Sequence, residues 1–312
     1  MERRGEFQMM LSEFMDLIQL ELTSESVVWH YTRAPGALGI IEGKSLHAAS
    51  ISLLNDSGEL FHGIDVIRQY FRDKPTDLPQ EKLTSSWFRH AAESLVEAKV
   101  RNSFVVSASE SGELQPLFLL YGSYAIGINS RAGLTKDLAD VGAEYKLDPS
   151  FEFGWRRVIY AQDRKLIVCQ QLYAALIELA KLDSDLRFNK NCERCLLAQE
   201  AIFQVAVYFK EESSSHEKEV RLYGRAKETS AKMNFKTSTY GILPYLEVTA
   251  KPLTAAQGER LNFPIERINL GPGLLASQSA KIGLELALET YRYKSGSGPV
   301  IVNILRTTRR PG

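Results

Sequence analysis

The 312-residue chain has few cysteines, no net charge and no long apolar run, and each shortage excludes a class of protein. Because 38 Lys and Arg residues balance 38 Asp and Glu residues, no global field exists to hold nucleic acid or attract cations. No apolar run is long enough to span a bilayer. The apolar stretch near the start contains Glu13, Asp16 and Glu21, unlike a signal peptide. We therefore expect a cytoplasmic protein without a membrane partner.

The three cysteines are an odd number, which without a secretion signal indicates reduced thiols. Cys192 and Cys195 have metal-ligand spacing, and Cys169 is a candidate third ligand, but no second pair completes a zinc site. Buried or surface thiols are the preferred interpretation. The glycine-rich dinucleotide fingerprint is also missing, which argues against a Rossmann oxidoreductase.

Strand and helix patterns follow one another without the regular βαβ rhythm of a doubly wound fold. This favours an α+β fold whose core is a mixed, mostly antiparallel sheet with helical insertions. No obvious linker divides the chain. We predict an N-terminal amphipathic helix in residues 1–25 and a single α+β domain over residues 26–312, with a helical insertion at about residues 163–210.

Apolar periodicity predicts the individual elements. Strands are expected at residues 27–29, 46–48, 102–109, 124–128, 158–160, 219–225, 235–240, 243–248, 265–270 and 299–305. Helices are expected at residues 35–42, 59–71, 80–100, 163–209 with a polar break at 183–191, and 279–291.

Polar residues gather on three of the predicted strands. His30, Tyr31 and Thr32 end the first strand, and such groups are costly in a core unless they are partnered or used. Ser107 and Ser109 alternate with apolar residues, so they share one face of their strand. Each signal is weak in isolation, because a single strand histidine is more often structural than catalytic.

Downstream, Glu217, Glu219 and Arg221 alternate, which predicts that all three project from one face of a strand. A solvent-facing ladder of charges that screen one another would also explain the pattern. Lys218 fits that explanation poorly, because it would then lie on the apolar face beside Val220.

The order of several short motifs resembles a widespread bacterial family known only as a domain of unknown function. Its members begin with an H-Y-T strand, continue through a G-x-L turn and an L-N-D-x-x-E segment, and later carry an E-x-E-x-R strand. The matching segments cover roughly residues 27–305 and are His30–Thr32, Gly43–Leu46, Leu54–Glu59, Phe104–Ser109, Tyr121–Gly122, Glu217–Arg221, Pro244–Tyr245 and Gly271–Pro272. One departure is the apolar stretch Leu117–Leu120, where the family usually has a Trp-Arg pair.

More remotely, the chain is similar to ADP-ribosyltransferases. Those enzymes start with a strand that bears His or Arg, continue with a helix and a turn like Gly39–Leu46, and finish with a strand that bears a catalytic Glu. The resemblance implies an ADP-ribosyltransferase-like fold and NAD as the substrate. It implies an ADP-ribosyltransferase or NAD glycohydrolase, acting as a bacterial toxin or antiphage defence effector, with a protein or a nucleic acid as the acceptor of any ADP-ribosyl group.

The same resemblance assigns roles to residues. Glu219 would be the catalytic acid, Glu217 would orient the acceptor, and His30 would hold the ribose next to nicotinamide. The other residues expected at the NAD site are Tyr31, Thr32, Ser107, Ser109, Tyr121 and Arg221. Arg221 would either bind a phosphate of the dinucleotide or neutralise Glu219.

The chemistry suits these residue types. Cleavage of the nicotinamide–ribose bond develops positive charge on the sugar, which a nearby carboxylate stabilises. A histidine within hydrogen-bond range fixes the sugar, and Tyr31 or Tyr121 would stack on the nicotinamide ring. No metal is needed.

Two alternatives stay open. The first is a regulatory module that binds a nucleotide or another small ligand without turnover, which the apolar stretch at residues 117–120 supports. The second is a nuclease or other hydrolase that uses Asp56, Glu217 and Glu219 around a metal. Homo-oligomerisation also stays open.

Overall fold

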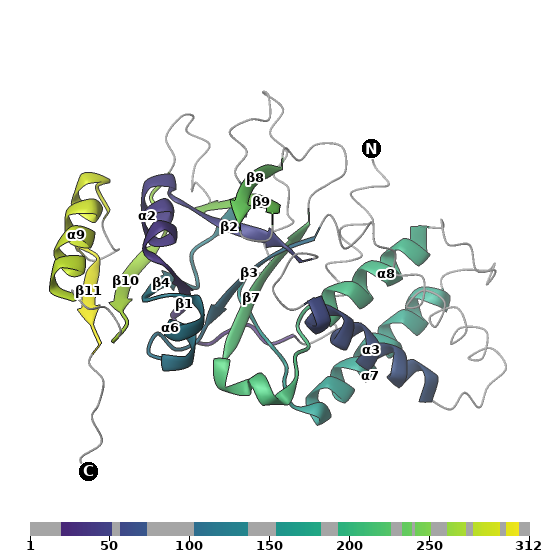
Figure 1. The fold of residues 1–312 in the computed structure, drawn as a ribbon. Coiled ribbons are helices and arrows are strands. Elements are labelled where there is room, and N and C mark those ends of the chain that lie inside the picture. Colours follow the sequence, from purple (N-terminus) through teal and green to yellow (C-terminus); the bar gives the residue numbers. More distant parts are fainter. Residues whose placement is uncertain are drawn as a thin grey trace, which may run out of the picture. The chain divides into compact units, whose positions relative to one another are not determined.

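The computed structural model describes residues 20–51, 57–73, 103–136, 154–181, 193–225, 233–238, 241–250, 261–272, 277–293 and 298–305 (Figure 1). The chain divides into two compact units. One, which we call the helical unit, comprises residues 1–21, 51–101 and 157–216; the other, the sheet unit, comprises residues 22–50, 102–156 and 217–312. Residues 1–19 and 80–100, where helices were predicted, lie outside the described residues.

Three helices pack together in the helical unit: α3 (Ser57–Asp73), α7 (Gln162–Lys181) and α8 (Glu193–Ala206). Apolar positions recur at helical spacing in each, which gives every helix a face to bury. The prediction of a helical hairpin is confirmed by α7 and α8. The unit is larger than the expected insertion, because α3 belongs to it as well.

The strands form a mixed, mostly antiparallel sheet in the order β11-β10-β4-β1-β3-β2-β9-β5, with β7 paired to β3 and β8 paired to β9. Only β10 and β11 run parallel among the strand pairs whose register is described here. The fold is therefore α+β, as predicted. The strands are β1 (Val27–Thr32), β2 (Ser45–Ser50), β3 (Ser103–Ser109), β4 (Tyr124–Asn129), β5 (Leu134–Lys136), β6 (Arg156–Arg157), β7 (Glu219–Arg225), β8 (Asn234–Ser238), β9 (Gly241–Ala250), β10 (Ile265–Leu270) and β11 (Ile301–Ile304).

The strand predicted at residues 158–160 is wrong. Ile159 makes only a single bridge, to Phe209, and the two-residue strand β6 precedes it. An apolar triplet can be buried without belonging to a ladder, and periodicity cannot distinguish the two cases.

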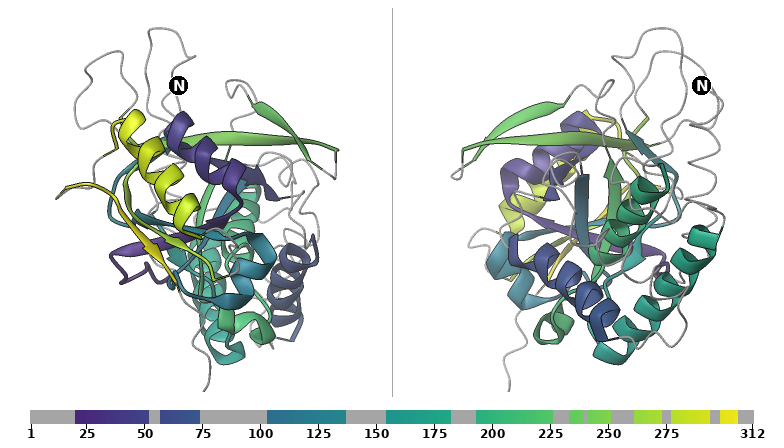
Figure 2. Two further views of the ribbon diagram at one scale, coloured as in Figure 1. Left: turned by 60° about the vertical axis from the view of Figure 1, so that its left-hand side comes forward. Right: turned by 90° about the vertical axis from the view of Figure 1, so that its right-hand side faces the viewer.

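One face of the sheet carries the main hydrophobic core. Phe104, Val106 and Ala108 of β3 point into it, as do Val220 and Leu222 of β7. Helices α2 (Ala34–Gly43) and α9 (Ser277–Thr290) also contribute buried side chains to this core, and they lie side by side in Figure 2. Strict alternation in β3 and β7 thus assigns the intervening polar residues to the opposite face.

A short helix that the sequence did not predict packs on that opposite face. It is α6 (Gln115–Tyr121), and its residues Leu117 and Phe118 form a second apolar cluster with Trp29 and Tyr31. The helix ends at Gly122, whose φ is 126°, and a Cβ there would lie 2.6 Å from the carbonyl oxygen of Thr32. Glycine is therefore required where the end of α6 meets the end of β1.

None of the helices in the part of the chain that the structure describes has the length and apolar character needed to cross a bilayer.

Candidate functional site

Strand β3 has two partners along one edge, and they diverge from one another. Trp29 of β1 pairs with Ser109 at one end, whereas Ala49 of β2 pairs with Val105 nearer the other end. The opposite edge of β3 is fully occupied by β7. Between the two pairings, residues 106–108 have no registered partner in β1 or β2. We call this opening, at residues 106–108, the fork.

The imidazole of His30 lies at the fork. Its Nδ1 is 3.0 Å from the carbonyl oxygen of Ser107. The imidazole therefore takes the place of the missing ladder partner of that carbonyl. Since a carbonyl can only accept a hydrogen bond, Nδ1 carries the proton and donates it, and Nε2 of the neutral ring is an acceptor. Burial lowers the pKa of His30, against the opposing effect of the Ser107 hydrogen bond, and Lys236 lowers it further. His30 is therefore neutral near pH 7.

Glu219 and Arg221 lie on β7, directly opposite Ser109 and Ser107 of β3. Arg221 Nε donates to Glu219 Oε1 at 2.7 Å, and Nη2 donates to Oε2 at 2.9 Å. The two side chains are only 3% and 8% exposed. Such a bidentate pair holds the carboxylate rigidly and offsets its charge. Arg221 was expected either to bind a phosphate of the dinucleotide or to neutralise Glu219, and the structure contains the contact with Glu219.

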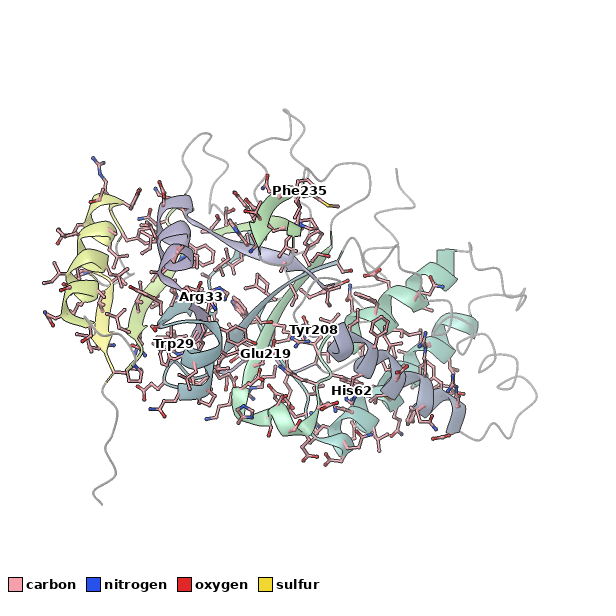
Figure 3. All side chains as sticks on the ribbon, viewed as in Figure 1. Trp29, Arg33, His62, Tyr208, Glu219 and Phe235 are labelled. Atoms are coloured by element: carbon pink, nitrogen blue, oxygen red, sulfur yellow. The ribbon has the colours of Figure 1, made fainter. Side chains whose placement is uncertain are left out.

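The ladder registers decide which residues share a face. Opposite residues in an antiparallel ladder point the same way, so Trp29, Ser109 and Glu219 form one row across three strands. His30 follows Trp29 and begins on the other face of β1. Its ring reaches the edge of β3, where Nδ1 meets the Ser107 carbonyl. Figure 3 labels Trp29 and Glu219. His30 and Glu219 thus lie on the two strands that flank β3 at its opposite edges, and they begin on different faces of the sheet.

Glu217 does not continue the alternation of β7, and that prediction is wrong. It ends a 3-10 helix, Glu212–Glu217, and Lys218 follows with a left-handed φ of 48° before the strand begins at Glu219. The carbonyl of Glu217 accepts a hydrogen bond from Ser109 Oγ at 2.7 Å. The turn at Lys218 also explains why this residue does not occupy the apolar face.

Tyr31, expected to stack on a ligand, is built into the fold. Its ring is 7% exposed and packs edge-to-face on Phe118. Its hydroxyl donates to the carbonyl of Ser111 at 2.8 Å and accepts from the amide of Leu114 at 3.0 Å. Desolvation raises the pKa of Tyr31 to about 12. Because its hydroxyl both donates and accepts a hydrogen bond, Tyr31 fixes the loop before α6, and it does not face the fork.

The remaining predicted residues divide between structural and accessible positions. Ser109 Oγ accepts from the Ser111 amide at 3.2 Å as well as donating to Glu217, so it closes a turn. Thr32 packs against Gly36 in the first turn of α2. Ser107 is partly exposed at the fork, and Tyr121 is 42% exposed at the end of α6.

A cluster that sequence reasoning missed lies beside the fork. His47 of β2 stacks on Tyr245 of β9, with ring centroids 3.9 Å apart and planes at 26°. Nζ of Lys236 on β8 is 5.7 Å from the centroid of the Tyr245 ring. Desolvation lowers the pKa of His47 to about 4, with further lowering by Lys236 and His30. The isolated histidine within the predicted strand at residues 46–48 was the available signal.

The metal alternatives find little support in the described residues, where no group of three or more His, Cys, Asp or Glu side chains could hold an ion. Asp56 and Cys192 lie outside the described residues, as does the side chain of Cys195. Cys169 is a buried free thiol in α7, and burial raises its pKa to about 12.

No protein-family model, no curated protein and no solved structure matches the chain.

Proposed function

We propose that the sheet unit binds NAD at the fork and cleaves its nicotinamide–ribose bond, as an ADP-ribosyltransferase or NAD glycohydrolase. The observation that carries the proposal is the adjacency of β1, β3 and β7, with the hydrogen bond from His30 to Ser107 joining the first two. The three strands that carry the expected His, the Ser pair and the Glu are separated in sequence by up to about 190 residues, yet they are consecutive neighbours in one sheet.

His30 supplies a suitable contact for the sugar. Its Nδ1 is anchored to the main chain, so the ring orientation is fixed and Nε2 has one defined direction. A neutral Nε2 accepts a hydrogen bond from a ribose hydroxyl, which holds the sugar in place without adding positive charge. A protonated ring would oppose the cationic transition state, so the lowered pKa of His30 favours the reaction.

Glu219 supplies the negative charge. As the bond between the ribose C1′ and the pyridinium nitrogen breaks, nicotinamide leaves with the electron pair and the sugar becomes oxocarbenium-like. Water or an acceptor nucleophile then adds to C1′ and loses its proton. The carboxylate of Glu219 stabilises the sugar cation, and Arg221 holds it in one orientation through two hydrogen bonds.

The experiment is to incubate the purified full chain with NAD labelled in the nicotinamide ring and to measure released nicotinamide. We expect release by the unmodified protein and a loss of at least about 100-fold in Glu219→Gln, the magnitude typical for removing one preorganised electrostatic contact. His30→Gln should lose activity as well. Glu285→Gln changes an exposed carboxylate on α9 and should leave the rate unchanged.

Because Glu219→Gln also disturbs a buried ion pair, its circular dichroism and its melting temperature must accompany the rate. No release by the folded, unmodified protein would contradict the proposal. So would a folded Glu219→Gln variant with an unchanged rate.

A second function is favoured by one specific observation. Both oxygens of Glu219 are already bonded to Arg221, and the carboxylate side chain is 8% exposed. A neutralised carboxylate suits a module that binds a nucleotide without turnover. This function predicts a rise in melting temperature with NAD or ADP-ribose and no nicotinamide release. The two proposals therefore differ in product formation and not in binding.

A further inference from the structure

We infer that Lys236 of β8, together with the stacked His47 and Tyr245, forms an anion subsite that takes the pyrophosphate of the dinucleotide. The inference deepens the proposed function and rests on it for the identity of the ligand. It identifies three residues to which the resemblance assigned no role.

The ladders place these side chains on the face opposite the main core. Leu46 and Ala48 of β2 enter the core, so His47 between them points the other way. His47 is directly opposite Glu247 of β9, and Tyr245 lies two residues along on the same face. Lys236 is opposite Leu243, again two residues from Tyr245. Lys236, Tyr245 and His47 therefore share the face that carries Ser107 and Arg221.

The cluster adjoins the fork. The β2–β3 register pairs Ala49 with Val105, so His47 is the β2 residue that would face Ser107 if the ladder continued. His30 reaches Ser107 from the other side of the opening. The pKa of His47 is lowered mainly by desolvation and further by Lys236 and His30, in keeping with the position of both histidines beside Ser107. A ribose held by His30 would therefore have its phosphates within reach of this face.

The charge of the cluster suits an anion. Both histidines have lowered pKa values and are neutral near pH 7, so the cation is Lys236. Desolvation lowers the pKa of Lys236, and none of the ion pairs recorded among the described residues includes it. Desolvation raises the pKa of Tyr245, and Glu247 on the same face raises it further. Lys236 is also exposed to solvent, so an ammonium without such a partner is accessible to a doubly charged phosphate group.

A simpler explanation for Lys236 is protection of an edge strand. Strand β8 pairs only with β9, and lysine is common on such edges because it discourages strand addition. That role requires only a charge that extends into water. It does not account for a lysine held near an aromatic ring that is itself stacked on a histidine, an arrangement that orders the ammonium.

The test measures binding by isothermal titration calorimetry to the full chain, with ADP-ribose, inorganic pyrophosphate and phosphate-free adenosine as probes. We expect Lys236→Gln to weaken ADP-ribose and pyrophosphate at least tenfold and to leave any adenosine binding unchanged. Lys236→Arg should retain most of the affinity. Lys281→Gln, on α9 and paired with Glu285, is the matched control and should bind like the unmodified protein.

The outcomes separate the subsite from the catalysis. If NAD releases no nicotinamide but ADP-ribose binding still depends on Lys236, the catalytic proposal fails and the subsite stands. Pyrophosphate binding that depends on Lys236, without any ADP-ribose binding, would support the anion site and replace the dinucleotide with another phosphate ligand. An unchanged affinity in Lys236→Gln, or no binding of either phosphate probe by the unmodified protein, would overturn the inference.

The pH dependence provides a further check. Ligand binding through Lys236 should weaken as the pH rises and the ammonium loses its proton, earlier than for an ordinary lysine because its pKa is lowered. Lys236→Arg should abolish this alkaline loss, since a guanidinium stays charged. The same loss in both proteins would assign it to another group and overturn the role of Lys236.

Discussion

The two units of the chain accommodate buried polar groups in different ways. In the sheet unit, His30 and Tyr31 bind main-chain carbonyls, and Arg221 binds a carboxylate through two hydrogen bonds. In the helical unit, Lys165 is 2% exposed, and its Nζ lies 3.2 Å from Nε2 of His62, a side chain. Desolvation lowers the pKa of Lys165, and the nearby thiol of Cys169 is also buried.

Backbone geometry explains the difference. Helices satisfy the main-chain groups of their interior residues, so a buried side chain between helices must find another side chain. A sheet whose strands diverge leaves carbonyls without ladder partners, and polar side chains bind to them. Burying a polar side chain at the fork therefore costs less free energy, because main-chain carbonyls are available as partners. Lys165 instead contacts the side chain of His62.

The largest expected effect follows from breaking the ion pair of the sheet unit. Arg221→Met leaves Glu219 buried without its partner and should lower the free energy of unfolding by about 3–5 kcal/mol. The double variant Arg221→Met/Glu219→Leu should recover most of that loss, because no uncompensated charge remains. Urea denaturation of both variants measures the difference.

The helical unit supplies the matched control for this experiment. Lys165→Met replaces a desolvated cation with an apolar side chain of similar length and should change the free energy of unfolding by less than about 1 kcal/mol. A loss as large as that of Arg221→Met would show that the lysine is as strongly bound as the sheet pair, and the comparison between the units would fail.

An intermediate effect is expected from close packing of helix backbones. A Cβ at Gly63 of α3 would lie 2.1 Å from the carbonyl oxygen of Ala206 in α8, so Gly63→Ala should cost about 1–3 kcal/mol. Gly39 of α2 has no atom within 4 Å of such a Cβ, and Gly39→Ala should stabilise by up to about 1 kcal/mol. Hydrogen exchange of peptides from each unit measures both changes. Equal effects at the two glycines would contradict the packing argument.

The smallest effect is a pH dependence of the sheet unit. The pKa of His47 falls to about 4 in the folded protein, so the unfolded chain binds more protons between that value and the ordinary pKa of 6.5. Stability contributed by this group should therefore decline as the pH falls from 6.5 towards 4. The ring is exposed, which limits the effect to less than about 1 kcal/mol. His47→Phe keeps the stack and should flatten the slope in urea titrations at pH 7 and 5.

Much of the fold could be predicted from local patterns. Alternation in residues 219–225 and 265–270 located β7 and β10 to the residue, because both strands pack an apolar face on the core. Helical periodicity located α7 and α8, and the polar break predicted at residues 183–191 lies outside the described residues. Helix α6 was missed because its apolar run is short, and such a run fits a strand, a helix or a loop equally well.

The candidate site was only partly predictable. The motif order selected His30, Ser107 and Glu219, whose strands are neighbours in the sheet. The pattern could not reveal that Tyr31 would be fixed by Ser111 and Leu114, since those contacts come from a loop some 80 residues away. Nor could it reveal Lys236, His47 and Tyr245 as a cluster, because each belongs to a different strand.

The sequence by itself determined the class of fold, the position of most strands and which residues could face a core, because these follow from side-chain periodicity within a few consecutive residues. Only the tertiary structure decided that β1 and β2 part along one edge of β3, that Arg221 closes on Glu219, and that His47, Tyr245 and Lys236 gather beside the fork. Those features depend on strand registers and on contacts between residues far apart in the chain, and neither is recorded in the local pattern of any single strand.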